Sequence, residues 1–176
     1  MPLYRGESAL FNGLKGLETD YLVRLLRVHQ NVEEIAKNQL SEKSLNMAQA
    51  YADGVNKFAR DNPKKVNAKL HPITKEDVIA GSYIQHLFFA GLDRDLAVMS
   101  NHVSTEIPTG SNAIAVNGAK SEGESSFLLI NSHQPLAGPV GWYELNVKSK
   151  SGWSAHGGNF PGSFVVNVGF NDSIGW

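Results

Sequence analysis

Residues 110–116, Gly-Ser-Asn-Ala-Ile-Ala-Val, divide the chain into two kinds of sequence. From Ser111 onward the chain contains short runs rich in β-branched and aromatic residues, at positions 113–116, 127–130, 143–147 and 164–168. Gly, Pro, Asn and Ser residues separate these runs, so we predict four strands. The run at 127–130 is apolar throughout, which is typical of a strand covered on both faces. We therefore expect helices to cover the sheet.

The sequence before Ser111 predicts helices. Between about residues 17 and 99, apolar residues recur at spacings of three and four with few glycines, as in helices with one buried face. Ser41 is expected to cap a helix that runs through residues 45–59. Asn62-Pro63 is expected to end it, because proline cannot continue the hydrogen-bond ladder.

A second helix start is predicted at Thr74-Lys75-Glu76-Asp77. A hydroxyl cap there precedes two acidic residues, which complement the positive end of the helix dipole. The helix is expected to run on through Phe88 and Phe89.

The two kinds of sequence meet in residues 104–110, which have loop composition and no helical period. We therefore predict an α+β fold with a helical part at 1–110 and a β-rich part at 111–176, the helices packing on the strands. Residues 171–176 end in mid-pattern without a closing turn. We expect the sheet to be truncated there, with an unpaired edge.

Composition excludes several classes of protein. The 176 residues carry a net charge of -1, with 41% hydrophobic and 19% charged residues, which favours a soluble globular protein and argues against a nucleic-acid partner. No apolar run is long enough to span a membrane, and residues 1–7 lack the apolar core of a signal peptide. The chain has no cysteine, so covalent catalysis would need another nucleophile.

Gly110-Ser111-Asn112 lies where the predicted loop becomes a strand. A glycine before the serine would allow the backbone distortion that an N-to-O acyl shift at Ser111 requires. Gly-Ser-Asn is equally typical of an ordinary turn, so the tripeptide alone leaves both interpretations open.

A wider set of motifs resembles the penicillin acylase family, which includes acyl-homoserine lactone acylases and cephalosporin acylases. The motifs that resemble the start of the family's β subunit are Ser111–Val116, Leu129–Pro135, Trp142–Glu144, Gly152-Trp153, Gly157-Gly158, Phe160–Gly162, Gly169–Asn171 and Ile174–Trp176. Two upstream segments, Ala50–Asn56 and Ile73–Val78, are similar to landmarks of the α subunit. The resemblance implies an N-terminal-nucleophile hydrolase with a four-layer αββα sandwich, of which this chain would form a part.

The resemblance implies a self-cleaving serine amidohydrolase. In the family the precursor cuts itself before the serine, which places the cleavage at Gly110-Ser111 and the nucleophile at Ser111. The freed α-amine then serves as the base. An α-amine titrates near pH 8, so about a tenth or more is neutral at pH 7, and no separate histidine base is needed.

His133 falls at the family position where a His or Gln orients the serine and its amine, and the alternative for it is a structural histidine. Phe88, Phe89 and Trp142 are candidates for the substrate-binding pocket, with Trp153 a candidate by residue type; packing in the core is the alternative for each. The oxyanion-hole donors are expected beyond residue 176.

No cofactor is required by this chemistry. Many relatives bind Ca²⁺ at the subunit interface, but we expect the main acidic ligands beyond residue 176. Asp93 and Asp95 are the candidates within the chain, and a charged helix face is the other interpretation of them.

The resulting functional hypothesis is an acylase that cleaves the amide of an N-acyl substrate, such as an acyl-homoserine lactone or a β-lactam, through an acyl-enzyme on Ser111. It would act as an α/β heterodimer after self-cleavage, in the periplasm or outside the cell as relatives do. One alternative is a catalytically incomplete fragment with an uncut Gly110-Ser111 bond. Another is a small-ligand binding module that needs no free amine at Ser111.

Overall fold

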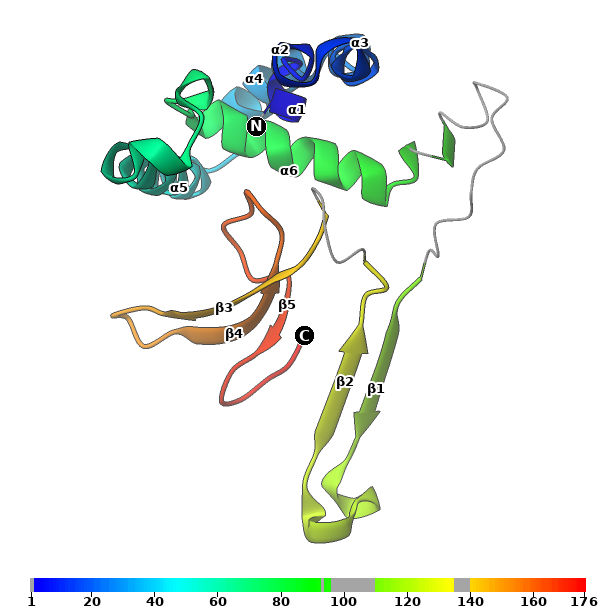
Figure 1. Ribbon diagram of the computed structural model, residues 1–176. Coiled ribbons are helices and arrows are strands. Elements are labelled where there is room, and N and C mark those ends of the chain that lie inside the picture. The colour runs from blue at the N-terminus through cyan, green and yellow to red at the C-terminus, as the bar shows by residue number, and fades with distance from the viewer. Residues whose placement is uncertain (1, 93, 96–109, 135–139) are drawn as a thin grey trace. The chain divides into compact units, whose positions relative to one another are not determined.

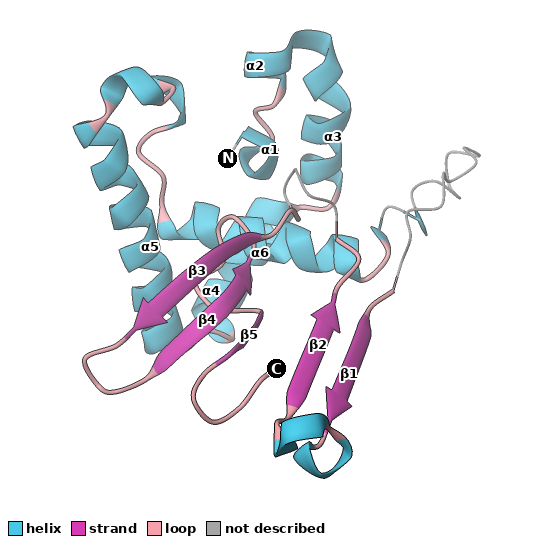
Figure 2. Ribbon diagram, turned by 60° about the horizontal axis from the view of Figure 1, so that its bottom comes forward, coloured by secondary structure: helices cyan, strands magenta, loops and turns pink. Residues whose placement is uncertain are grey.

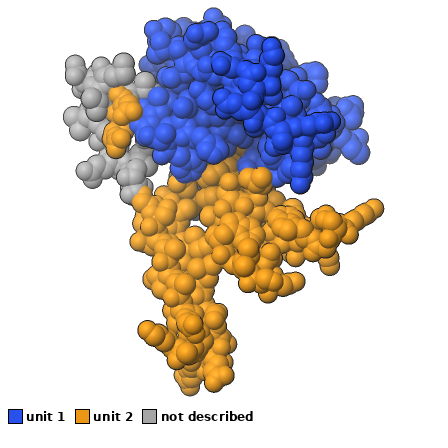
Figure 3. All heavy atoms as spheres, turned by 180° about the vertical axis from the view of Figure 1, so that it is seen from behind, with its two compact units in different colours: residues 1–92, 162–164 blue, residues 93–161, 165–176 orange. Residues whose placement is uncertain are grey.

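The computed structural model describes residues 2–92, 94–95, 110–134 and 140–176. The chain divides into two compact units, coloured separately in Figure 3. Unit 1 comprises residues 1–92 and 162–164, and unit 2 comprises residues 93–161 and 165–176. The boundary predicted at Gly110-Ser111 marks a cleavage point, which a division by compactness does not test, so it stays a prediction.

Unit 1 is helical, as predicted (Figure 1). Its α-helices are α1 (Pro2–Arg5), α2 (Ala9–Asn12), α3 (Leu17–Leu25), α4 (Val28–Asn38), α5 (Glu42–Asp61) and α6 (Lys75–Phe89). Short 3₁₀ turns occur at Gly13–Gly16, Pro63–Lys65 and Ala68–Leu70. The sequence did not predict α1 and α2, each of which is only 4 residues long.

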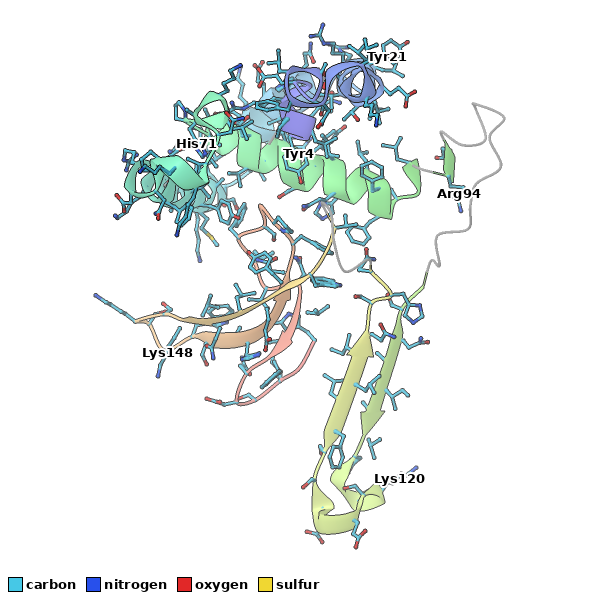
Figure 4. All side chains as sticks on the ribbon, viewed as in Figure 1. Tyr4, Tyr21, His71, Arg94, Lys120 and Lys148 are labelled. Carbon is cyan, nitrogen blue, oxygen red and sulfur yellow. The ribbon has the colours of Figure 1, made fainter. Side chains whose placement is uncertain are left out.

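Helix α6 is at the centre of unit 1 and packs against α1, α4 and α5. Tyr4 of α1 lies against it (Figure 4), so close to Gly81 that a side-chain carbon built there would be 2.9 Å from the Tyr4 ring. The remaining members of the core are aliphatic: Val23, Val28, Val32, Ala48, Ala52, Ile73, Val78, Ile79, Ala80 and Ile84. Burial of this apolar surface is the main force that holds the helices together.

Both predicted helix caps are confirmed. The Ser41 hydroxyl accepts a hydrogen bond from the Ser44 backbone N–H at 3.2 Å, and α5 ends at Asp61, just before Asn62-Pro63. At α6, the Thr74 hydroxyl accepts from the Asp77 backbone N–H at 3.2 Å, and the Asp77 carboxylate accepts from the Thr74 N–H at 2.8 Å. This reciprocal pair is a capping box.

Asp77 also ties α6 to the N-terminal helix of unit 1. The Arg5 guanidinium donates through Nε and Nη2 to the two Asp77 carboxylate oxygens, at 2.8 and 2.5 Å. Arg5 Nη2 donates as well to the Pro72 carbonyl at 2.8 Å. Burial raises the pKa of the Asp77 carboxyl, but the hydrogen bonds from Arg5 and Thr74 outweigh it, so the pKa lies below its usual value.

Unit 2 contains two antiparallel sheets, seen from another side in Figure 2. Strands β1 (Asn112–Val116) and β2 (Phe127–Asn131) form a hairpin with the register Asn112↔Asn131 to Val116↔Phe127. Its far end consists of 3₁₀ turns at Gly118–Lys120 and Glu122–Glu124, where Figure 4 labels Lys120. The second sheet has the order β3 (Tyr143–Lys148), β4 (Ser154–Asn159) and β5 (Val168–Phe170).

The predicted strand at residues 164–168 is wrong, and a strand at Ser154–Asn159 was missed. Of the predicted run only Val168 lies in a strand, since residues 161–167 form turns, bends and irregular backbone before β5. Strand β4 contains Gly157 and Gly158, which have poor strand propensity. Close approach of the neighbouring backbone explains them, since a side-chain carbon built at Gly157 would lie 2.0 Å from the Val168 carbonyl oxygen.

The expectation that residues 127–130 are covered on both faces is also wrong in this structure. All residues of β2 are exposed, including Phe127 at 58% and Leu129 at 55%. Apolar side chains on both faces of the hairpin remain accessible, although the chain at Gly175 lies against Leu128. The α+β class is confirmed, whereas the four-layer αββα sandwich stays a prediction.

Within the part of the chain that the structure describes, no helix has both the length and the apolar character needed to cross a membrane.

Candidate functional site

The hairpin brings the predicted cleavage site and His133 together. Gly110 and Ser111 precede the first residue of β1, and His133 follows the last residue of β2. Because Asn112 pairs with Asn131, continuing the register places Ser111 opposite Ser132 and Gly110 opposite His133. A side-chain carbon built at Gly110 would lie 3.6 Å from His133 Nδ1, which confirms this proximity.

Ser111 itself is exposed at the open end of the hairpin. Gly110 is not among the glycines of the described chain that adopt a positive φ. The backbone distortion expected at Gly110-Ser111 stays a prediction. A nucleophile at this place would be accessible from solvent.

The turn after β2 fixes the backbone of His133. The Asn131 side-chain oxygen accepts a hydrogen bond from the His133 N–H at 3.1 Å, and His133 has a φ of 53°. A left-handed conformation is uncommon for a residue with a side chain and persists where neighbouring contacts hold it. The positive φ therefore directs the imidazole toward β1, and not to the face that strand alternation would give it.

Trp142, which lies just before β3, supports this turn. Its indole Nε1 donates to the Ser132 hydroxyl at 2.5 Å, and its ring stacks on Phe160 at a centroid distance of 4.0 Å. Trp142 thus contacts the residue next to His133. Its predicted role in substrate binding stays a prediction, but the structure adds this contact with the site.

A pocket of about 560 Å³ lies within unit 2. Leu128 and Ile130 line it from β2, and their cross-strand partners are Ala115 and Ala113. Strand alternation assigns Ser111 to the same face as these alanines. The other lining residues are Gly157, Gly158, Val168, Gly169, Phe170, Asn171, Asp172, Ser173, Ile174 and Gly175.

The remaining predicted site residues lie elsewhere in the chain. Phe88 and Phe89 end α6 in unit 1, where Phe88 packs against the core and Phe89 is 49% exposed. Trp153 is 51% exposed beside the turn between β3 and β4. The predicted contact of Phe88 and Phe89 with substrate stays a prediction.

Calcium ligands are not evident among the described residues. Asp93 lies outside them, and the exposed Asp95 carboxylate is 3.8 Å from Arg94 Nε. No group of three or more His, Asp or Glu side chains arranged to hold a metal ion occurs within the described ranges. Calcium binding by the family's larger subunit interface stays a prediction.

Comparison with known proteins identifies the family. A family model described as penicillin amidase matches residues 2–176. The chain belongs to the penicillin amidase family. This confirms the resemblance that the motifs around Ser111 and the two upstream segments indicated.

The curated relatives of this penicillin amidase family member include acyl-homoserine lactone acylases. The acyl-homoserine lactone acylase PvdQ of Pseudomonas putida is 36% identical over 67 residues, which are 38% of this chain and 9% of that protein. The proteins of the same name from Pseudomonas fluorescens and Pseudomonas syringae pv. tomato are each 33% identical over equal shares. The matched part thus spans about a tenth of the length of these relatives.

Sequence reasoning missed one member of the site, Asn112. Its side-chain nitrogen Nδ2 lies 2.8 Å from His133 Nε2. The residue stands next to Ser111 in the quoted motif, but its contact depends on the strand register and on the left-handed turn at His133. Neither can be deduced from the motif alone.

Proposed function

We propose that Ser111 is the nucleophile of an N-terminal serine amidohydrolase that is released by cleavage of the Gly110-Ser111 bond. The observation that carries the proposal is the end of the hairpin, where an exposed Ser111 adjoins Gly110 and Gly110 faces His133. Family membership supports the chemical class, and the geometry supports the assignment of these residues to it.

Self-cleavage would begin with attack of Ser111 Oγ on the Gly110 carbonyl carbon. The peptide C–N bond breaks, the Ser111 nitrogen takes the proton that the hydroxyl loses, and an ester joins Gly110 to Ser111. Water then hydrolyses this ester and leaves a Gly110 carboxylate and a free Ser111 amine. His133 is placed beside the Gly110 side of the bond, where a side chain can orient the reacting amide.

Turnover would use the new α-amine as the base. The neutral amine takes the Ser111 hydroxyl proton while Oγ attacks the substrate amide, and the proton passes to the departing substrate amine. Water hydrolyses the acyl-enzyme and releases the acid. An α-amine has a pKa near 8, so about a tenth is neutral at pH 7, which suits this role.

The substrate class is an N-acyl amide, such as an acyl-homoserine lactone or a β-lactam side-chain amide. Relatives named acyl-homoserine lactone acylases favour the first. The pocket beside Leu128 and Ile130 would hold the acyl chain, because its lining is largely apolar and lies on the face assigned to Ser111. Phe88, Phe89 and Trp142 stay candidates for the same substrate.

The oxyanion donors, Ca²⁺, the α/β heterodimer and a periplasmic or extracellular location belong to the same proposal, on the strength of the family resemblance. The steps above use the residues of this chain alone.

The second candidate is a chain that folds but has no activity of its own. The exposed apolar faces of the hairpin favour it, because Phe127 and Leu129 are accessible where an active hydrolase would need a covered, water-excluding sheet. This candidate predicts that Gly110-Ser111 stays intact.

The deciding experiment is intact mass spectrometry with N-terminal sequencing of the purified chain. The proposal predicts a second N-terminus that reads Ser-Asn-Ala-Ile, and its loss in a Ser111→Ala variant. A variant with Ser151→Ala, an exposed serine in the turn between β3 and β4, is the matched control and should still be cut. A single uncut chain in every variant would support the inactive candidate instead.

A further inference from the structure

Asn112 and His133 make the closest side-chain contact at the open end of the hairpin. Asn112 Nδ2 lies 2.8 Å from His133 Nε2, a hydrogen-bond distance. Asn112 is the first residue of β1 and is paired with Asn131, whose side chain in turn holds the His133 N–H. The carboxamide and the imidazole are therefore both attached to fixed backbone.

The chemistry of the two nitrogens sets the direction of this hydrogen bond. A carboxamide nitrogen carries two hydrogens and can only donate. His133 Nε2 must then accept, and a neutral imidazole that accepts at Nε2 carries its hydrogen on Nδ1. An imidazolium could not accept at all, since both of its nitrogens donate.

We infer that Asn112 is a positioning residue that holds His133 as the neutral Nδ1–H tautomer and turns this N–H toward Gly110. The 3.6 Å separation between His133 Nδ1 and a carbon built at Gly110 shows which nitrogen faces the glycine. The Ser132 hydroxyl held by Trp142 and the Asn131 side chain keep the turn in place.

The inference rests on the proposed function and makes it more specific. A hydrogen-bond donor beside Gly110 can stabilise negative charge on the carbonyl oxygen when Ser111 attacks, whereas an acceptor there would repel it. His133 would thus serve as a donor to the scissile amide and not as the base. This assignment agrees with an α-amine as the base in later turnover.

The test is nitrogen-15 NMR of the His133 ring in the full chain carrying Ser111→Ala, which keeps Gly110 attached. We expect Nδ1 at the shift of a protonated ring nitrogen and Nε2 at that of an unprotonated one. A His133→Gln spectrum identifies the signals among the six histidines. The aspartate in Asn112→Asp has nearly the same shape as asparagine but offers only hydrogen-bond acceptors. His133 should then carry its hydrogen on Nε2.

A matched control is Asn117→Asp, at the other end of the hairpin, where the side-chain oxygen accepts from the Ala119 N–H. It should leave the His133 signals unchanged. Protonated Nε2 in the chain with Asn112, which would mean that the carboxamide oxygen faces the ring, would overturn the inference. So would an Asn112→Asp spectrum identical to that of the parent.

Self-cleavage gives a separate readout in chains that retain Ser111. Asn112→Asp should slow cleavage on the order of a hundredfold, the usual loss when one donor to an oxyanion is removed. The ring spectra do not depend on cleavage. An uncut chain with the Nδ1–H tautomer would refute the proposed function alone, and a cut chain with the Nε2–H tautomer would refute only the role of Asn112.

Discussion

Unit 1 and unit 2 are stabilised by different interactions. In unit 1 a cluster of aliphatic residues is almost completely removed from solvent, with Val28 and Val78 at 0% exposure. In unit 2 the hairpin that carries Ser111 has apolar residues more than half exposed, such as Ile114 and Phe127 at 57% and 58%. Burial is the main contribution in unit 1, whereas the hairpin depends on its backbone ladder and on side chains near its open end.

The residues that form the packed core and the residues of the candidate site lie in different units. The candidate nucleophile, its neighbour Gly110 and His133 all lie in unit 2, and the best-packed residues lie in unit 1. The two can be followed independently, because all three tryptophans are in unit 2 while helices α1 to α6 are in unit 1. Tryptophan fluorescence reports on unit 2, and far-ultraviolet circular dichroism reports chiefly on unit 1.

The largest expected effect comes from Asp77→Ala in unit 1. The Asp77 side chain is 9% exposed and pairs with Arg5, and it also closes the capping box with Thr74. Removing Asp77 takes away charge-assisted hydrogen bonds of a partly buried ion pair and the helix cap, at a cost of roughly 2–5 kcal/mol. Urea unfolding followed at the helical circular dichroism signal should show a lower midpoint with little change in tryptophan fluorescence.

Asp61→Ala is the control for that prediction. Asp61 pairs with Lys57 on the surface, where the two side chains are 54% and 68% exposed. An exposed pair of this kind contributes a few tenths of a kcal/mol. Equal losses for Asp77→Ala and Asp61→Ala would contradict the assignment of Asp77 as a structural link.

The next effect is expected in unit 2, from Gly157→Ala in β4. The added carbon would lie 2.0 Å from the Val168 carbonyl oxygen, so β4 and β5 would have to separate, at a cost of about 1–3 kcal/mol. Trp176 exchanges backbone hydrogen bonds with Gly169 of β5, at 2.8 and 2.9 Å. The fluorescence transition should therefore move to lower urea.

Gly54→Ala is the same substitution in unit 1 with the opposite expected sign. Gly54 lies inside α5, and a carbon built there meets nothing within 4 Å. Alanine favours a helix over glycine by about 0.5–1 kcal/mol, so the helical transition should move to higher urea. If Gly54→Ala lost as much stability as Gly157→Ala, the loss at Gly157 could not be assigned to its contact with the Val168 backbone.

These glycines also show what could be predicted from the sequence. The caps at Ser41 and Thr74 were predicted because they depend on residues three positions apart. Strand β4 was missed because Gly157 and Gly158 have poor strand propensity. Glycine is present at these positions because the backbone of Val168 and Gly169 packs close to them, and those residues come about ten positions later in the sequence.

The candidate site shows the same limit. The roles of Gly110, Ser111 and His133 were predicted from the resemblance to a family, including the match of the spacing between Ser111 and His133. The contact between Asn112 and His133 needs both the register of the hairpin and the positive φ at His133, which no local pattern specifies. Trp142 was predicted as a substrate contact, and its hydrogen bond to Ser132 emerged only when β3 was placed beside the turn.

The smallest expected effect is the pH dependence of unit 1 that comes from Asp77. Although burial raises the pKa of this carboxyl, hydrogen bonds from Arg5 and Thr74 lower it below the value in the unfolded chain, about 4. A carboxyl whose pKa is lower in the folded state contributes stability that is fully present above its unfolded pKa. That contribution is lost as the pH falls through the folded pKa.

The Asp77→Asn variant isolates this contribution, because other carboxylates titrate in both proteins. The parent chain should have the higher urea midpoint of the helical signal at pH 6, and the difference should shrink steadily below about pH 4. The stability that the parent chain loses on acidification is smaller than the stability lost in Asp77→Ala, because a protonated Asp77 side chain still fills its place and can still hydrogen-bond. A difference that stays constant down to about pH 2.5 would show that shape, and not the charge that faces Arg5, is what Asp77 contributes to unit 1.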